Sequence, residues 1–191
     1  KADSYFSTII WFSLAAGLTL AVIGAIFMEP VALALGASAD MLGDCVLYGR
    51  IRMLSLAFFI LQFAFQPLFA TAGKPHLGFV VTVASGVTNI ILDWLLVGVL
   101  GWQVVGAASA TVASELLGGI VPLIYFLSPN SSFLRLGKPR ADWRLLGKVC
   151  VNGSSEMMSI IASSVVAMLY NFQLMAYLGE DGVSAYGVIM Y

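Results

Sequence analysis

Five long apolar segments constrain the fold of this chain more than any other feature of its sequence. A helix needs about 20 mostly apolar residues to cross a bilayer, whereas a barrel strand needs about ten alternating ones. Since 60% of the residues are hydrophobic and 10% carry a charge, we expect an all-α membrane protein folded as a polytopic helical bundle. The five segments are Tyr5–Met28, Arg52–Ala72, Leu77–Leu100, Val104–Leu127 and Cys150–Leu178, and a sixth begins near Val183.

The connections between these segments predict how the helices are arranged. The short turns "GKPH" and "GWQ" make the middle helices antiparallel neighbours. After the first segment, "EPVALALGASADMLGDCVLYGRI" predicts a short interfacial helix followed by a turn at Gly36. The stretch from Ser128 to Lys148 has the composition of a linker. The chain starts without methionine and ends inside an apolar segment, so we expect a fragment of a longer protein.

Basic residues predict the orientation, because cytoplasmic loops of membrane proteins are enriched in lysine and arginine. If the linker from Ser128 to Lys148 is cytoplasmic, seven basic residues lie inside, and Arg50 and Arg52 lie outside with Glu180 and Asp181. The seven are Lys1, Lys74, Arg135, Lys138, Arg140, Arg144 and Lys148. We therefore expect a multi-pass protein of the plasma membrane whose linker is cytoplasmic.

Three carboxylates lie inside the predicted spans: Asp93, Glu115 and Glu156. Acidic residues are rare within spans, usually face a bundle interior or a wet cavity, and often mark ion or substrate pathways. The alternative interpretation is a buried acid held by neighbouring hydroxyls for packing. The sequence offers no lysine or arginine within the spans as a partner, so we expect these groups to hold a proton or a mobile cation.

Polar residues on the same spans recur at helical spacing and therefore share faces. The second span has Gln62 and Gln66 one turn apart, with Phe59 and Phe69 on the same face. The other three spans each carry one stripe of polar or small residues. These are Thr82, Ser85, Asn89 and Asp93 on the third span, Ala108, Thr111, Glu115, Gly118 and Pro122 on the fourth, and Asn152, Glu156, Ser159 and Ser163 on the fifth. Hydrogen bonding between helices is an alternative explanation for the serines and glutamines.

Span direction predicts which of these polar residues share a site. The third span enters from the cytoplasm and the fourth from outside, which puts Asp93 and Thr111 at a similar depth. Together with Asn89 they supply a carboxylate, a hydroxyl and an amide oxygen, the hard ligands of a small cation. We expect this cation-coupling site to take H⁺ or Na⁺. A secondary coupling site or substrate chamber is predicted at Glu156, Glu115, Gln62 and Gln66.

Nothing in the sequence favours an enzyme. It contains no phosphate-binding glycine loop, nucleophile triad or metal-ligand spacing, and we expect no cofactor and no bound metal beyond Na⁺ at Asp93. Its net charge of −1 gives no reason to expect a nucleic-acid partner. The expected partners are small organic, often cationic, substrates and the lipid bilayer, and the expected state is a monomer.

A specific combination of segments resembles the multidrug and toxic compound extrusion (MATE) family over essentially the whole chain. In order, these segments are "VALALGAS", "PLFATAGKP", "TNIILDWLLV", "VVGAASATVASE", "NGSSEMM" and "LMAYLGEDGVSAYGV". The resemblance implies part of a twelve-helix, two-lobe transporter that works by cation-coupled alternating access. Residues 1–127 would be the last four helices of the amino-terminal lobe, 128–148 the cytoplasmic inter-lobe linker, and 149–191 the start of the carboxyl-terminal lobe.

The resemblance also assigns roles to individual residues. Asn89 and Asp93 fall on the family's N-x-x-x-D cation pair, Thr111 falls on the hydroxyl that faces it, and Glu156 falls where some members carry a carboxylate in the seventh helix. The resulting hypothesis is a H⁺- or Na⁺-coupled antiporter that exports organic compounds. The alternatives are a flippase for lipid-linked precursors on a related scaffold, and a channel or non-transporting membrane scaffold.

Overall fold

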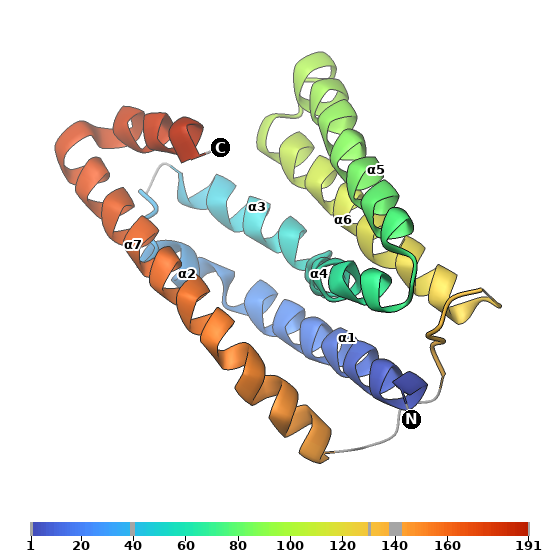
Figure 1. Cartoon of the computed structure of the whole chain (residues 1–191). Coiled ribbons are helices and arrows are strands. Elements are labelled where there is room, and N and C mark those ends of the chain that lie inside the picture. The colour runs from blue at the N-terminus through green and yellow to red at the C-terminus, as the bar shows by residue number, and fades with distance from the viewer. Residues whose placement is uncertain (1, 39–40, 130, 138–142, 191) are drawn as a thin grey trace.

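Helices account for every regular element in the described part of the chain (Figure 1). The computed structural model describes all residues except 1, 39–40, 130, 138–142 and 191. Lys1, Lys138 and Arg140 of the charge count therefore lie outside the described residues, as do the side chains of Glu180 and Asp181. The elements are α1 (Ala2–Ile26), α2 (Met28–Ala34), α3 (Leu42–Met53), α4 (Leu56–Thr71), α5 (Pro75–Asp93), the π-helix η1 (Trp94–Val99), α6 (Gln103–Leu127) and α7 (Trp143–Met190).

The expected membrane-spanning segments are confirmed, with one difference at the second. Among the described residues, four helical stretches are long and apolar enough to cross a bilayer, and a fifth span results if α3 and α4, bent by 54°, are counted together. The second span thus begins at Leu42 and not at Arg52. Because Asp44, Arg50 and Arg52 make α3 polar, the sequence pattern hid this helix. The short helix before the turn is also confirmed, since α2 ends before Gly36, whose φ is 91°.

Aromatic side chains from three helices form the core at one end of the bundle. Phe65 of α4 stacks on Phe126 of α6, with ring centroids 5.5 Å apart and an angle of 11° between the rings. Phe6 of α1 meets the edge of Phe126 at 5.0 Å. Higher up, α4 and α6 pack backbone to backbone: a Cβ at Gly119 would lie 2.7 Å from the carbonyl oxygen of Phe58. Close helix contact through small residues is typical of membrane bundles.

The pair formed by α5 and η1 with α6 is the most extensive helix contact in the bundle (Figure 1). Pro75 begins α5, a position where the missing N–H costs nothing. The tight connection to α6 depends on Gly101, whose φ is 67°, and on a hydrogen bond of 2.9 Å from the Trp102 N–H to the Leu96 carbonyl. The two helices are antiparallel neighbours, as the short turn predicts.

The segment after α6 folds back onto the bundle instead of leaving it. Leu134 and Leu136 are buried in the aromatic core. The Phe133 N–H donates to the Ala72 carbonyl and the Leu136 N–H to the Phe126 carbonyl. Residues 143–148, which the sequence placed in the linker, already belong to α7. The division of the chain into two lobes at these boundaries stays a prediction.

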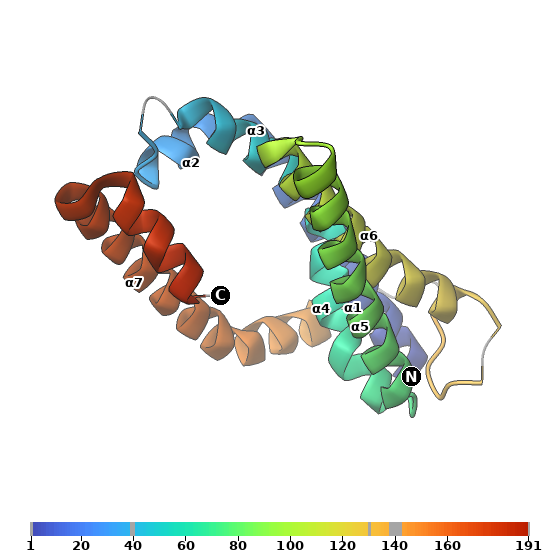
Figure 2. The ribbon, with the colours of Figure 1, turned by 90° about the horizontal axis from the view of Figure 1, so that it is seen from above.

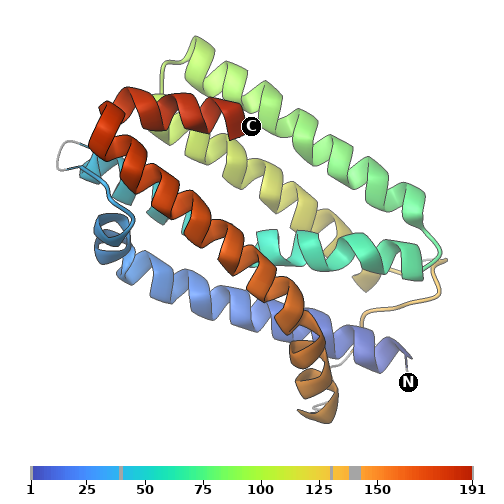
Figure 3. The same ribbon diagram turned by 60° about the vertical axis from the view of Figure 1, so that its left-hand side comes forward.

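Helix α7 stands apart from the bundle along most of its length (Figure 2). The 48 helical residues from Trp143 to Met190 are broken at Gly179, whose φ of 65° and ψ of −154° are not helical. This break agrees with the predicted end of one span at Leu178 and the start of another near Val183. Figure 3 shows the chain turning back at this end of α7 toward the C-terminus. Near this end α7 approaches α2, where the ring of Phe172 lies against Gly36.

Candidate functional site

Two contacts set the register between the helices that carry the predicted cation site. The Ser85 hydroxyl of α5 donates a hydrogen bond of 2.7 Å to the Ser114 carbonyl of α6. Further along, a Cβ at Gly106 would lie 3.1 Å from the backbone of Leu96. Since α5 and α6 run antiparallel, Asn89 lies level with Thr111. Asp93 lies about one helical turn, ~5.4 Å, beyond that level.

Asn89 has an unsatisfied polar atom. Its Nδ2 is buried and has no hydrogen-bond partner among the described residues. A buried amide left in this state costs about 1–3 kcal/mol, and the assignment of nitrogen and oxygen in an amide can be exchanged by a flip. The side chain is therefore available to a further ligand or to water at this level of the bundle.

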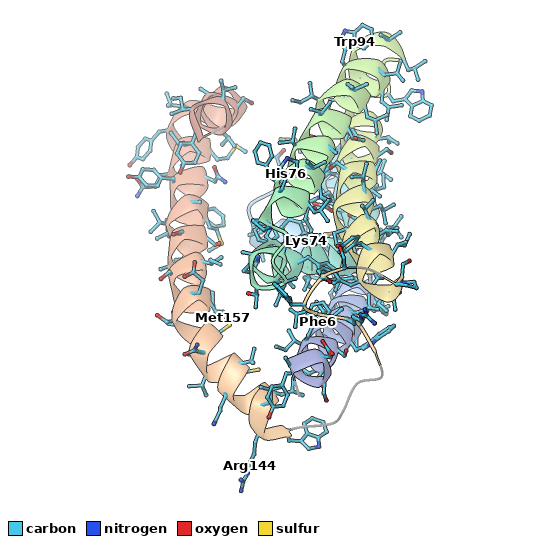
Figure 4. All side chains as sticks on the ribbon, turned by 45° about the vertical axis from the view of Figure 1, so that its right-hand side comes forward. Phe6, Lys74, His76, Trp94, Arg144 and Met157 are labelled. Carbon is cyan, nitrogen blue, oxygen red and sulfur yellow. The ribbon has the colours of Figure 1, made fainter. Side chains whose placement is uncertain are left out.

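Asp93 is half-buried at the point where the helix geometry changes. It is the last residue of α5, and the wider π-helix begins at Trp94. Short π segments within helices occur frequently at functional sites. No hydrogen bond or ion pair joins Asp93 to another residue in the described part of the chain. Figure 4 shows Trp94 near one end of the α5–α6 pair and Lys74 and His76 at the start of α5.

Thr111 contributes an oxygen whose proton is already used. Its hydroxyl donates a hydrogen bond of 2.9 Å to the Ala107 carbonyl, one turn earlier in α6. Because a hydroxyl has one proton and two lone pairs, the oxygen keeps its capacity to accept a proton donor or to bind a cation. The described residues contain no cluster of three or more histidine, cysteine or acidic side chains that could hold a transition metal.

Glu115 has a basic partner, and the expectation that no lysine or arginine would pair with it is wrong. Arg52 donates a hydrogen bond to Oε1 of Glu115 and forms an ion pair with it. The Ser55 hydroxyl lies 2.5 Å from Oε2. The distribution of basic residues assigns Arg52 to the external side, which stays a prediction. Arg52 lies in α3, from which its side chain reaches Glu115.

The two glutamines proposed for a chamber make contacts between helices. Gln66 of α4 donates a hydrogen bond of 3.1 Å to the Thr82 hydroxyl of α5. The Gln62 side chain lies so close to α6 that a Cβ at Gly118 would come within 2.4 Å of it. These contacts match the alternative interpretation, hydrogen bonding and packing between helices.

Glu156 lies on an exposed face of α7, which stands apart from the α5–α6 pair that carries Asp93 (Figure 2). It borders a hollow of about 460 Å³ with the polar residues of its predicted stripe. The lining is Glu156, Ser159, Ile160, Ser163, Ser164 and Ala167. The hydroxyls of Ser159 and Ser163 donate to backbone carbonyls one turn earlier, so Glu156 is the group in this hollow that can carry a charge.

Sequence reasoning missed a cavity of about 350 Å³ between α2, α3 and α7. Its walls are almost entirely apolar, with Met28 of α2, Tyr48 of α3, and Phe172 and Met175 of α7 among them. Methionine side chains adapt to ligands of different shape. No local pattern could have found this cavity, because its two walls lie more than 100 residues apart in the sequence and meet only when α7 lies beside α2.

The family model and the curated proteins that match this chain agree with each other. A family model described as MatE matches residues 1–95. The "Multidrug export protein MepA" of Staphylococcus haemolyticus is 30% identical over 98% of this chain and 42% of its own length. The protein of the same name from Staphylococcus aureus is 28% identical over 98% of this chain and 41% of its own. The chain thus spans about two-fifths of the length of these relatives.

Solved structures share the fold. The inward-facing conformation of a multidrug resistance MATE family transporter of the MOP superfamily superimposes with a TM-score of 0.87 at 20% identity. The match covers 97% of this chain and 42% of that chain. A MOP superfamily transporter from Pyrococcus furiosus gives a TM-score of 0.82 at 20% identity, over 99% of this chain and 43% of that chain.

Proposed function

Because this chain belongs to the MATE family of membrane transporters, we propose that it is part of a cation-coupled exporter of organic compounds. Relatives that carry the name multidrug export protein support the export of small molecules. The observation that carries the coupling proposal is the set formed by Asn89, Asp93 and Thr111. Among the described residues it combines a buried unsatisfied amide, a carboxylate without a partner and a hydroxyl oxygen free to accept.

The cation would bind where these oxygens lie within about one helical turn of each other. Asp93 would hold H⁺ as a carboxylic acid or Na⁺ as a carboxylate, and Asn89 and Thr111 would add neutral oxygen ligands. One elementary charge moving inward across 100 mV releases about 2.3 kcal/mol, to which a concentration gradient adds. Release of the cation on the other side would return Asp93 to its unoccupied state, so that each cycle exchanges inward cation for outward substrate by alternating access.

Two lobes would move in this cycle. Helices α1 to α6 would belong to the amino-terminal lobe and α7 would begin the carboxyl-terminal lobe, with the basic segment between them on the cytoplasmic side of the plasma membrane. The nearly separate position of α7 supports this division. We propose that Glu156 is a second acidic group of the coupling or substrate site, on the side of the carboxyl-terminal lobe.

A flippase for lipid-linked precursors is less well supported. Such a protein needs basic groups free to bind phosphate. Arg52 lies inside the bundle, but its guanidinium is engaged with Glu115. The apolar cavity beside Phe172 and Met175 suits the ring systems of organic drugs better than a phosphate.

The test is the Asp93→Asn substitution in the full-length protein. An amide keeps the shape of the carboxyl group and still forms hydrogen bonds, but it has neither a titratable proton nor a negative charge. Efflux of ethidium driven by an imposed H⁺ or Na⁺ gradient should fall by about a hundredfold or more, about 2.7 kcal/mol in barrier terms, at unchanged expression. The matched control is Asp44→Asn, at an exposed acid on α3. Efflux at the parent rate under both gradients would contradict the coupling proposal.

A further inference from the structure

A buried ion pair joins α6 to the bend between α3 and α4. Glu115 is 5% exposed, and both of its carboxylate oxygens have partners. Arg52 donates to Oε1 and the Ser55 hydroxyl approaches Oε2. The guanidinium of Arg52 also lies over the ring of Phe59, 5.9 Å from its centroid. The charge of Glu115 is thus neutralised and each of its oxygens has a hydrogen-bond donor, which helps to keep a carboxylate inside a membrane bundle.

The two partners of Glu115, Arg52 and Ser55, lie on either side of the bend between α3 and α4. Arg52 lies in the last turn of α3, and Ser55 is the residue that precedes α4. Between them the backbone makes two tight turns, from the Leu54 N–H to the Ile51 carbonyl and from the Ser55 N–H to the Arg52 carbonyl. The two helices diverge there by 54°. One carboxylate of α6 therefore holds both sides of the bend.

Helix α4 cannot adjust this bend by moving on α6, because their backbones are in contact below it. The Phe58 carbonyl lies 2.7 Å from the position of a Cβ on Gly119, and the Gln62 side chain fills the space beside Gly118. Further along, Phe65 stacks on Phe126. The α4–α6 pair thus forms a fixed base, and α3, which also packs against α6, α2 and α1, meets that base at an angle.

Helix α3 is also one wall of the cavity that faces α7. Cys45, Tyr48 and Gly49 line that cavity from α3, and Phe172 and Met175 line it from α7. A rotation of α3 about the residues near Ser55 would move this wall toward or away from α7. The ion pair between Arg52 and Glu115 joins the last turn of α3 to α6 and opposes such a rotation.

We propose that Glu115 is a positioning residue, which with Arg52 and Ser55 forms a clamp that sets the angle between α3 and α4 and thereby the width of the cavity between α3 and α7. The clamp positions α3 and takes no direct part in binding the cation. This proposal is therefore independent of the cation-coupling proposal. Losing one partner leaves a buried charge without compensation, so either single substitution releases α3.

Cys45 provides the readout, because this half-buried thiol lines the cavity on the wall that would move. The experiment uses the purified full-length protein in lipid nanodiscs with every other cysteine replaced. The rate of Cys45 modification by N-ethylmaleimide is measured for Glu115→Gln, Arg52→Gln and the double variant. We expect each single variant to raise the rate about tenfold, as a coupling energy between contacting residues predicts. The rate of Cys45 modification in the double variant should equal the rate in each single variant and should not be the product of the two increases.

Arg50→Gln is the matched control, because it removes the same charge two residues earlier from an exposed position on α3. It should leave the Cys45 rate unchanged. If Glu115→Gln fails to fold, the Ser55→Ala variant tests the clamp instead. It keeps the ion pair but removes the contacts of the Ser55 hydroxyl with Glu115 and with the Arg52 carbonyl. It should raise the Cys45 rate by about two- to fivefold. Rates within twofold of the parent in folded variants, or equal effects of Arg50→Gln and Arg52→Gln, would overturn the clamp.

Discussion

The hydroxyl of Ser85 on α5 donates a hydrogen bond to the backbone carbonyl of Ser114 on α6 across 2.7 Å, in a buried position. This bond and the close approach of Leu96 to Gly106 fix how the two antiparallel helices are aligned. The alignment brings Asn89 level with Thr111, although the two lie 22 positions apart in the sequence. The cation-site proposal therefore depends on helix register as much as on residue type.

The first prediction concerns the hydroxyl oxygen of Thr111. Thr111→Val keeps the shape of the side chain but removes this oxygen, whereas Thr111→Ser keeps it. We expect the valine variant to need about a tenfold higher concentration of the coupling cation for half-maximal transport, as for a lost charge-assisted contact of about 1.4 kcal/mol. The serine variant should stay close to the parent. Equal behaviour of the two variants in cation-titrated efflux would remove Thr111 from the site.

The second prediction concerns the aromatic core, and it uses two phenylalanines on the same helix. Phe65 is 1% exposed and stacks on Phe126, whereas Phe63 is 61% exposed on the other face of α4. Phe65→Ala should destabilise the protein by about 3–5 kcal/mol, because it leaves a cavity in the core. Phe63→Ala should have a much smaller effect. Thermal unfolding in detergent compares the two, and similar losses would mean that this core does not hold the bundle together.

The sequence predicted the parts of the fold that depend on local composition. Apolar length located the spans, and the break near Gly179 and the turn at Gly36 followed from residue type. Helix α3 was missed because its three charged residues resemble those of a loop. The charge of Arg52 is compensated in the structure by Glu115, a residue 63 positions away that no local pattern connects to it.

The candidate site was also predictable only in part, because some of its contacts join residues that are far apart in the sequence. Spacing on one helix placed Asn89 and Asp93 together, and span direction brought Thr111 close. The cavity between α3 and α7 depends on a contact between Gly36 and Phe172, which arises from tertiary packing alone. The residues near Leu134 and Leu136 looked like linker because a short extended segment has no periodic pattern, yet the structure buries both side chains.

The third prediction tests the orientation in the membrane. If the segment after α6 is cytoplasmic, Ser131 lies inside and Trp102, in the turn between η1 and α6, lies outside; both are exposed. In full-length protein without other accessible cysteines, Trp102→Cys should react with an impermeant maleimide in intact cells. Ser131→Cys should react only after the cells are permeabilised. The reverse pattern would invert the topology that the distribution of basic residues predicts.

The last prediction concerns Glu156, which borders the hollow on α7 beside Ser159 and Ser163. If its carboxyl group binds the coupling ion or a cationic substrate, Glu156→Gln should slow transport by about tenfold or more, about 1.4 kcal/mol in barrier terms. Expression and thermal stability should stay near those of the parent, because Glu156 is exposed and its hollow contributes no core packing. Glu29→Gln, at an exposed acid on α2, is the control for a change of charge alone. If Glu156→Gln lowers both stability and transport, Glu156 has a structural role instead. If efflux stays at the parent rate, Glu156 has no role in transport.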